Sequence, residues 1–521
     1  MKDKCDESLT NFQIDKDIVL KRLNNLAITK AMGPDELHPR VLKELSNEIV
    51  EVVTNIFQES IDSGSVPTLW NKAIVTAIHK KGSKTLASNY RPISLTCVLC
   101  KVLEGIVRAH ILDHLQQNDL LCNEQYGFVP KRSTSLQLLN VMEEWSKILD
   151  RGGNIDVIYC DIMKAFDQVP KKRLLQKVSA CGVKGTLLQW IDSFLSDRRF
   201  KVVVNGKQSS EGIVTSGVPQ GSVLGPLLFV IYINDMPQCV DSSLFMFADD
   251  TKAFREIVNS SDNDLLQNDI DNLSKWSADW LIKFHPEKCS VMHLGKNNPK
   301  NEYYLNGHKL CKSESERDLG VTVNDELTFK EHIESKISKA RQIWGMIRRS
   351  FIFIDWNTFS LLFKALVRPH LEYANCVWSP AGKGMIKEIE SVQRAATKQI
   401  QGLQRLSYPD RLRALGLPTL KHRRRRGDLI EMFKIMTGLY DPSAVPSFES
   451  VSENKLTRGH RYKLRRPLSK TKLGHNRFTS RIVNDWNSLP HEIVESPTLN
   501  TFKNRLDEYF TYDPTIYDPD I

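Results

Sequence analysis

The chain has 521 residues, of which 41% are hydrophobic and 26% charged, so it can form several subdomains around a sizeable core. No run of about 18 apolar residues occurs and the N-terminus has no apolar signal core, which argues against a membrane span and a secretory signal. The ten cysteines lack the spacing of a disulfide framework and predict a reducing compartment, and the net charge of +10 favours an anionic partner.

Residues 155–162 alternate in the manner of a β-strand, with one face formed by Ile155, Val157, Tyr159 and Asp161. Asp161 therefore ends a strand whose other residues on that face are apolar or aromatic. A carboxylate in this position either faces solvent or belongs to a shared acidic site. The chain continues through Phe166 into a helix that we expect at about residues 170–180.

Residues 216–227 read Ser-Gly-Val-Pro-Gln-Gly-Ser-Val-Leu-Gly-Pro-Leu. Their glycines and prolines predict a tight loop in which the backbone can approach a ligand closely. An apolar helix is expected to follow from Leu227.

The most informative segment is Phe-Ala-Asp-Asp at residues 247–250. An apolar run at 244–248 precedes the acidic pair, and the pattern predicts a strand, a tight turn and a returning strand. Adjacent carboxylates repel each other, so Asp249 and Asp250 form either a solvated turn or a metal site. Hard oxygen ligands suit Mg²⁺, and Asp161 supplies a third carboxylate, which favours the metal site.

Farther along, apolar residues at helical spacing predict an amphipathic helix with basic side chains around it, at Ile333, Ile337, Ala340, Trp344 and Ile347. Two basic stretches follow, at 421–426 and 455–481, and the second has ten Lys or Arg and no Asp or Glu. Such stretches can neutralise nucleic-acid phosphates, and Tyr462 and Phe478 could stack on bases. The alternatives are a solvated charged face and, for the first stretch, a nuclear localisation signal.

Seven segments in this order resemble the reverse transcriptase domain of non-LTR (LINE-like) retrotransposons, especially the jockey-type and chicken-repeat-type group. The resemblance covers most of the chain, and the segments are residues 89–95, 125–134, 159–167, 217–222, 247–250, 280–289 and 317–320. It implies an α+β right-hand polymerase fold, with fingers, a palm built on an antiparallel sheet and a helical thumb. The implied divisions are an N-terminal helical extension (1–60), fingers and palm (61–324), a thumb (325–400) and a helical basic C-terminal region (401–521).

For the active site, the resemblance implies RNA-directed DNA polymerisation by two-metal phosphoryl transfer. Asp161, Asp249 and Asp250 would be the catalytic carboxylates. They would bind two Mg²⁺ ions, or Mn²⁺, with the Ile162 carbonyl as a further ligand. The metal ions would activate the primer 3′-hydroxyl and neutralise the triphosphate.

The implied dNTP pocket consists of Lys80, Arg91, Phe166, Gln220 and Lys288. Arg91 and Lys80 would contact the triphosphate, because Arg suits bidentate phosphate contacts and Lys acts as a point charge. The Phe166 ring would clash with a 2′-hydroxyl and favour dNTPs, and Gln220 would line the pocket near the 3′ side of the sugar. Lys288 would act as a general acid near the leaving phosphate. Phe166 could instead be a core residue, and both lysines could be solvated.

Nucleic-acid contacts are expected from Arg132 and from the basic stretches, through Arg423, Arg424, Arg425, Arg426, Arg465 and Arg466. The implied partners are an RNA template, a DNA primer, dNTPs and target DNA, with no membrane. The expected location is the nucleus or the cytoplasm, and the oligomeric state stays open.

Two departures from the family argue against autonomous transposition. Val129 stands where the family often has an arginine that binds the nucleic-acid backbone, and no endonuclease domain precedes the polymerase segments. Two other functions stay open. One is a viral RNA-dependent RNA polymerase, which would tend to carry a polar residue at position 166. The other is a decayed retroelement copy that binds nucleic acid without catalysis.

Overall fold

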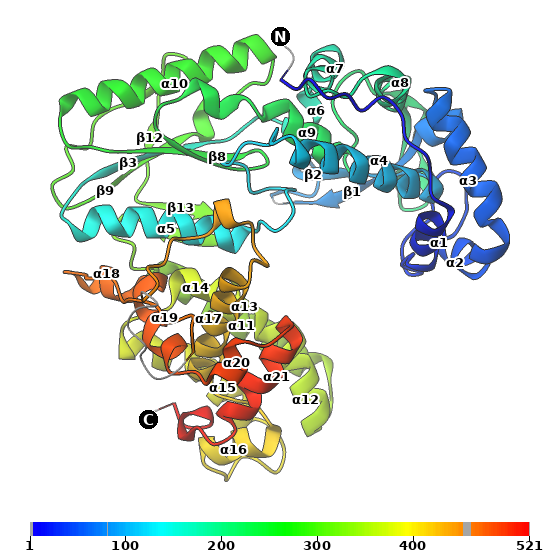
Figure 1. The fold of residues 1–521 in the computed structure, drawn as a ribbon. Helices are drawn as coiled ribbons and strands as arrows, with labels where there is room; N and C mark the ends of the chain where they lie inside the picture. Colours follow the sequence, from blue (N-terminus) through cyan, green and yellow to red (C-terminus); the bar gives the residue numbers. More distant parts are fainter. Residues whose placement is uncertain (1–3, 81, 452–459, 520–521) are drawn as a thin grey trace.

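The computed structural model describes residues 4–80, 82–451 and 460–519. Its helices and mostly antiparallel sheets make the expected α+β fold (Figure 1). Within these ranges, no helix combines the length and the apolar character that crossing a bilayer requires.

The central sheet has five strands in the order β12-β9-β3-β8-β7. They are β3 (Ile155–Cys160), β7 (Ser243–Phe247), β8 (Asp250–Glu256), β9 (Ser290–Leu294) and β12 (Cys311–Lys312). β3 pairs antiparallel with both β8 and β9, β7 pairs antiparallel with β8, and β12 runs parallel to β9. The strand predicted at 155–162 therefore lies in the middle of the sheet and ends at Cys160.

Helices cover both faces of this sheet, α10 (Ser260–Trp280) on one and α5 (Thr134–Asp150) on the other (Figure 1). Successive strand residues point to opposite faces. Ile158 accordingly belongs to the core that includes α10, whereas Val157 belongs to the core that includes α5. Both faces of β3 are buried, and the alternation in the sequence identified only one of them.

A second sheet has the order β2-β1-β4-β5, with β6 attached to β4. Its strands are β1 (Lys72–His79), β2 (Tyr90–Leu95), β4 (Arg199–Val204), β5 (Lys207–Gln208) and β6 (Gly212–Ile213). β1 is antiparallel to β2 and parallel to β4. This end of the molecule also carries the helices α1 (Lys16–Asn24), α2 (Pro39–Glu44), α3 (Ser46–Asp62) and α4 (Val98–Gln117) (Figure 1).

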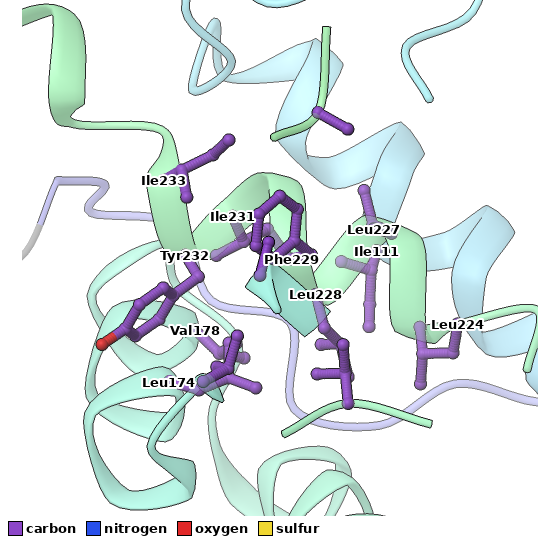
Figure 2. Close-up of a cluster of buried hydrophobic side chains, with 14 of the residues drawn as sticks. Ile111, Leu174, Val178, Leu224, Leu227, Leu228, Phe229, Ile231, Tyr232 and Ile233 are labelled. Carbon is purple, nitrogen blue, oxygen red and sulfur yellow. The ribbon is translucent and has the colours of Figure 1, made fainter. Parts of the chain in front are cut away.

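Helix α9 (Gly225–Ile233) lies in the interior, as Figure 2 shows. It is apolar on all sides, which is the pattern of a helix surrounded by protein, and all of its residues except Pro226 are buried. It packs against Leu174 and Val178 of α7 (Lys171–Ala180) and against Ile111 of α4. The short helix α6 (Ala165–Gln168) precedes α7, and α8 (Gly185–Leu195) follows it.

Two small antiparallel pairs lead from the sheets to the C-terminal helices, β10 (Tyr304–Leu305) with β11 (His308–Lys309) and β13 (Ser315–Asp318) with β14 (Val321–Asn324). Helix α11 (Lys330–Ser350) follows, and the five apolar positions predicted for it are all buried. The later helices are α12 (Trp356–Leu362), α13 (Pro369–Glu372), α14 (Asn375–Trp378), α15 (Lys383–Lys398), α16 (Tyr408–Leu415), α17 (Leu420–Met436), α18 (Lys472–Asn476), α19 (Phe478–Asn487), α20 (His491–Val494) and α21 (Leu499–Phe510). One core joins them with α5, and it spans the division expected at residue 400.

Candidate active site

The acidic turn, residues 247–250, is a β-hairpin between β7 and β8. Phe247 pairs with Asp250, which leaves Ala248 and Asp249 as a two-residue turn. Ala248 has a φ of 55°, a left-handed conformation that tight hairpin turns use and that non-glycine residues seldom adopt. The predicted strand, turn and strand are confirmed, and both carboxylates lie at one end of the central sheet.

A buried glutamine holds the acidic turn in place. The side-chain oxygen of Gln125 accepts hydrogen bonds from the backbone N–H groups of Ala248 (2.9 Å) and Gly127 (2.7 Å). Gln125 is fully buried, and a Cβ on Gly127 would lie only 2.5 Å from the Ala248 nitrogen. The backbone of Tyr126 also donates to Met246 of β7 at 2.8 Å. Gln125 acts on a turn 123 residues along the chain, a relation that no local sequence pattern reveals.

Asp161 joins the acidic turn through the strand register. Cys160 of β3 pairs with Thr251 of β8, so Asp161 comes next to Asp250 at the same end of the sheet. Burial raises the pKa of Asp249, and the negative charge of Asp161 raises it further. Burial and the charge of Asp249 raise the pKa of Asp250 to about 6. The three carboxylates therefore form one acidic site, in which like charges oppose the ionisation of Asp249 and Asp250.

The donor set of this site suits a divalent cation, although its side chains do not yet surround one point. In the part of the chain that the structure describes, no three Asp, Glu, His or Cys side chains converge as a ready-made metal site. One oxygen of Asp161 instead accepts a hydrogen bond from the Lys288 ammonium at 2.8 Å. Repelling, partly buried carboxylates need a counter-cation, and hard oxygen donors are the ligands that Mg²⁺ and Mn²⁺ prefer. Asp161, Asp249 and Asp250 are therefore the residues that would hold a divalent cation, in place of the Lys288 ammonium at Asp161.

The backbone after Asp161 pairs with the segment before Lys288. The Asp161 carbonyl accepts from the His285 N–H at 2.8 Å, and the Met163 N–H donates to the Lys283 carbonyl at 2.9 Å. The carbonyl of Ile162, between these two bonds, takes part in neither of them. Its role as a metal ligand stays a prediction.

The glycine loop, residues 216–222, packs against the helix that carries Phe166. The Val218 N–H donates to the Phe166 carbonyl at 2.8 Å, and a Cβ on Gly217 would lie 2.5 Å from the same oxygen. The side chain of Gln220 donates to the Asp167 carboxylate at 3.1 Å. The loop therefore fastens Gln220 to Asp167, the residue after Phe166; the role of Gln220 in a nucleotide pocket stays a prediction.

The Phe166 ring is half-buried and packs against two other aromatic rings. It stacks on Phe229 of α9, with the ring centroids 4.7 Å apart, and it meets the edge of Phe128 at 6.4 Å. Phe166 is thus both a core contact and a partly exposed surface, so the two interpretations of this residue do not exclude each other.

The two predicted cations of the pocket lie on one face of the β1–β2 hairpin. Arg91 pairs with Ile78, and Lys80 is two residues beyond Ile78, so the Lys80 and Arg91 side chains point to the same side. Both are exposed, and both lower the pKa of Asp249 against the effect of its burial. Their positive charge therefore reaches the acidic turn.

Two buried polar contacts support the site from behind. The Glu104 carboxylate accepts from the backbone N–H groups of Val223 (2.6 Å) and Leu224 (3.0 Å), at the positive end of the α9 dipole. Lys252 of β8 forms a buried ion pair with Asp318 of β13. The Glu104 contacts connect the residues between the glycine loop and α9 to α4. The Lys252–Asp318 pair connects β8 to the segment 317–320.

The structure corrects the role expected for Arg132. Its side chain is only 5% exposed and forms an ion pair with Asp441. The guanidinium also donates to the carbonyls of Asn123 (2.7 Å) and Gln125 (2.9 Å). Arg132 therefore joins a loop to the C-terminal helices, and its donors are not available to nucleic acid.

The arginine stretch of α17 is also corrected, because its side chains are paired inside the protein. Arg423 donates twice to Glu372, at 2.8 and 3.0 Å. Arg425 binds both Asp485 and Asp513, Arg426 binds Asp507, and Arg424 is buried with the acidic Glu390 and Asp428 near it. Nucleic-acid contact was expected here, with a solvated charged face as the alternative, but a helix turns through 100° per residue, so consecutive arginines point in different directions. In this structure the arginines of the stretch are engaged in ion pairs or buried and do not form one exposed basic face.

The second basic stretch, residues 455–481, has some side chains that are exposed and others that belong to the core. Arg465 and Arg466 are exposed, as a nucleic-acid contact requires, and Arg465 has one long ion pair of 4.0 Å with Glu449. Phe478, expected to stack on bases, is instead buried in the core, and Tyr462 packs against that core. Residues 455–459, at the start of the stretch, lie outside the described part of the chain.

Comparison with known proteins bears on the same segments. Residues 78–323 match the family model described as reverse transcriptase (RNA-dependent DNA polymerase). The chain is 28% identical over 407 residues to the RNA-directed DNA polymerase from mobile element jockey of Drosophila melanogaster, covering 74% of this chain and 44% of that protein. It is 28% identical over 400 residues to the probable RNA-directed DNA polymerase from transposon X-element of the same species, covering 74% and 43%.

A third relative is the probable RNA-directed DNA polymerase from transposon BS of Drosophila melanogaster, which is 27% identical over 403 residues, 73% of this chain and 44% of that protein. The chain thus spans less than half the length of these relatives. The expected resemblance to jockey-type elements is confirmed.

Replacing Gln125 with Met should destabilise the acidic turn. The new side chain has a similar size but accepts no strong hydrogen bond, so the N–H groups of Ala248 and Gly127 lose their partner in a buried place. We expect the free energy of unfolding to fall by about 1–3 kcal/mol and hydrogen exchange at Ala248 to accelerate. The matched control is Gln116→Met on the exposed side of α4. Unchanged exchange at Ala248 would contradict the assignment.

Replacing Arg423 with Ala should lower stability and leave nucleic-acid affinity unchanged, because the side chain is committed to Glu372. Hydrogen bonds to charged groups contribute about 1.5–3 kcal/mol each, and Arg368 stays beside Glu372 at 3.4 Å, so we expect a loss near the lower value. Arg466→Ala is the control with the opposite expectation, weaker RNA binding and unchanged unfolding. Equal stability of the wild type and Arg423→Ala in denaturant would show that the pairing contributes nothing.

Proposed function

We propose that this chain, whose residues 78–323 match the reverse transcriptase family model, is an RNA-directed DNA polymerase of a non-LTR retrotransposon. It would extend a primer 3′-hydroxyl with dNTPs on an RNA template. The observation that carries the proposal is the arrangement of Asp161, Asp249 and Asp250 at one sheet end, with the cations Lys80 and Arg91 acting on Asp249.

The chemistry would be an in-line phosphoryl transfer. Two divalent cations, Mg²⁺ or Mn²⁺, held by the three aspartates and the Ile162 carbonyl, would supply positive charge to the attacking and leaving oxygens. Asp161 would exchange its contact with Lys288 for this ligand role, since one of its oxygens now accepts from that ammonium. Lys288, released but still close, would donate a proton from Nζ to the leaving phosphate oxygen.

The nucleotide would be selected by the pocket beside the acidic turn. Arg91 and Lys80 would bind the triphosphate, Arg91 through paired N–H groups and Lys80 as a point charge. Phe166 would exclude a 2′-hydroxyl, and its stacking on Phe229 supports that role because the ring cannot easily retreat. Gln220, fastened to Asp167, would line the pocket near the 3′ side of the sugar.

We also infer the right-hand arrangement, with the central sheet as palm and the second sheet with its helices as fingers. Helix α11 and its neighbours would form the thumb, ending near residue 400, ahead of the basic C-terminal region. The partners would be an RNA template, a DNA primer and target DNA. The last of these would require entry into the nucleus.

Two rival functions have less support. An RNA-dependent RNA polymerase would accept rNTPs, whereas an aromatic ring occupies position 166. A non-catalytic copy that binds nucleic acid through its basic C-terminal region loses the contribution of Arg423 to Arg426, since those side chains are engaged within the protein.

Asp249→Ala should abolish primer extension on poly(rA)/oligo(dT) with dTTP and Mg²⁺. Loss of a metal-binding carboxylate removes several kcal/mol of transition-state stabilisation, which corresponds to a fall of roughly 10³-fold or more. Asp264→Ala, an exposed carboxylate on α10, is the control for folding and charge and should retain activity. Chelation with EDTA should mimic the Asp249 variant, and extension by that variant would reject the assigned site.

Phe166→Val should admit rNTPs. A clash that is removed from a pocket is worth about 1–3 kcal/mol, so the ratio of kcat/KM for dTTP over UTP should fall by roughly 10- to 100-fold. Phe166→Tyr keeps the ring and should keep the selectivity. A wild-type enzyme without preference between the two nucleotides would instead favour the RNA polymerase alternative.

A further inference from the structure

A cavity of about 350 Å³ lies among the C-terminal helices, and the three aspartates of the candidate active site are not among its lining residues. Helices α15, α17 and α19 supply most of its wall, and Ser379 and Thr515 complete it (Figure 1). One hydrophobic core holds these helices together. Sites for small molecules typically have volumes of about 300–1,000 Å³, so this cavity is large enough for a ligand.

Basic side chains outnumber carboxylates in the lining of this cavity. Arg481 binds Asp428 at 3.1 Å, and Arg425 binds Asp485 at 2.9 Å, which engages both carboxylates. Among the described residues, the other two basic side chains of the lining have no ion pair. The charged residues of the lining are Lys421, Arg424, Arg425, Arg481, Asp428 and Asp485.

Arg424 carries a buried donor that lacks a partner. The residue is only 4% exposed, and within the described ranges its Nη1 atom has no hydrogen-bond partner. Burial disfavours the charged guanidinium and lowers its pKa, and Glu390 and Asp428 oppose this effect through space. A guanidinium keeps its proton in proteins, so its unsatisfied N–H groups need an acceptor. Their planar fork matches the oxygens of a phosphate group.

Two further groups of the lining could take part in binding an anion. The Lys421 ammonium makes one long hydrogen bond, of 3.5 Å to the Pro519 carbonyl, which leaves it other donors. His422 is 4% exposed, and among the described atoms its Nδ1 has no partner. Burial lowers the pKa of His422 to about 4, so the ring is neutral at pH 7 and offers a hydrogen bond without charge.

The cavity is open to small ligands from solvent. The side chains of Arg425 and Asp485, which lie in the lining, are 34% and 36% exposed. The lining thus runs from a solvent-exposed ion pair to the buried Arg424. A continuous nucleic-acid strand is too bulky to bring its backbone phosphates to a guanidinium that is enclosed in this way, whereas a small or terminal phosphate group can enter.

We propose that this cavity binds a diphosphate group, either free or as part of a nucleotide. Arg424 and Lys421 contact its oxygens, and Arg425 and Arg481 add positive charge from the wall. The site is separate from the proposed polymerase site. A ligand that binds only the folded chain stabilises it, so occupancy stabilises the C-terminal helices.

The test measures the binding of inorganic diphosphate and of dTDP to the full chain, by titration calorimetry and by hydrogen exchange. EDTA is present throughout, so that no divalent ion bridges the ligands to the aspartates. We expect saturable binding and slower exchange in α17 and α19. Tighter binding of inorganic diphosphate would identify the free anion as the ligand, and tighter binding of dTDP would identify a nucleotide.

Two variants examine the assigned contacts. Hydrogen bonds to charged groups contribute enough that Arg424→Met should weaken binding by about 10- to 100-fold. Lys421→Gln should cause a smaller loss, and it keeps the test decisive if Arg424→Met does not fold, because Lys421 is partly exposed. The matched control is Lys398→Gln, an exposed lysine of α15 outside the lining, which should bind as the wild type does.

Failure of both ligands to bind saturably, or equal affinity of the wild type and Lys421→Gln, would overturn the proposal. Protection of α17 by a 5′-phosphorylated oligonucleotide but not by diphosphate would replace it with a nucleic-acid contact. Primer extension has no part in this test, so loss of the proposed polymerase function would leave the result unaffected.

Discussion

The register between β3 and β8 is the constraint on which the rest of this structure depends. Because Cys160 pairs with Thr251, the strand that ends in Asp161 stops beside the hairpin that carries Asp249 and Asp250. The carboxylates repel one another and are partly buried, so electrostatics alone would separate them. The ladder hydrogen bonds and the helices on both faces hold them together. A slip of one residue would turn Asp161 to the opposite face of the sheet.

The supports around this register are polar groups placed inside the protein. Gln125 holds the acidic turn, and Glu104 holds the backbone between the glycine loop and α9. The Lys252–Asp318 ion pair connects β8 to β13. Each support links parts of the chain that are far apart in sequence. A buried polar group without its partner is costly, so such contacts admit few alternative arrangements. The site is therefore preorganised by its surroundings more than by its own residues.

The basic side chains discussed above fall into two groups, those paired or buried inside the protein and those exposed to solvent. Arg132 and the arginines of α17 are ion-paired or buried, and they hold the C-terminal helices to one another and to the loop beside α5. Lys80, Arg91, Arg465 and Arg466 are exposed. Exposed cations can release counterions when they meet phosphates, whereas internally paired ones cannot without unfolding their partners. Among the predicted nucleic-acid contacts, the exposed ones are those that a partner can reach in this structure.

By itself, the sequence determined the strand predicted at 155–162 (β3, which ends at Cys160), the tight hairpin at 247–250, the apolar helix after the glycine loop and the buried face of α11. Periodicity and turn chemistry are local, so a single sequence reveals them. Only the tertiary structure decided which cations are exposed, that Phe478 is buried and that Gln125 holds the acidic turn. These outcomes depend on which distant segments share a core, because burial and partner charge act through space and leave no trace in local pattern.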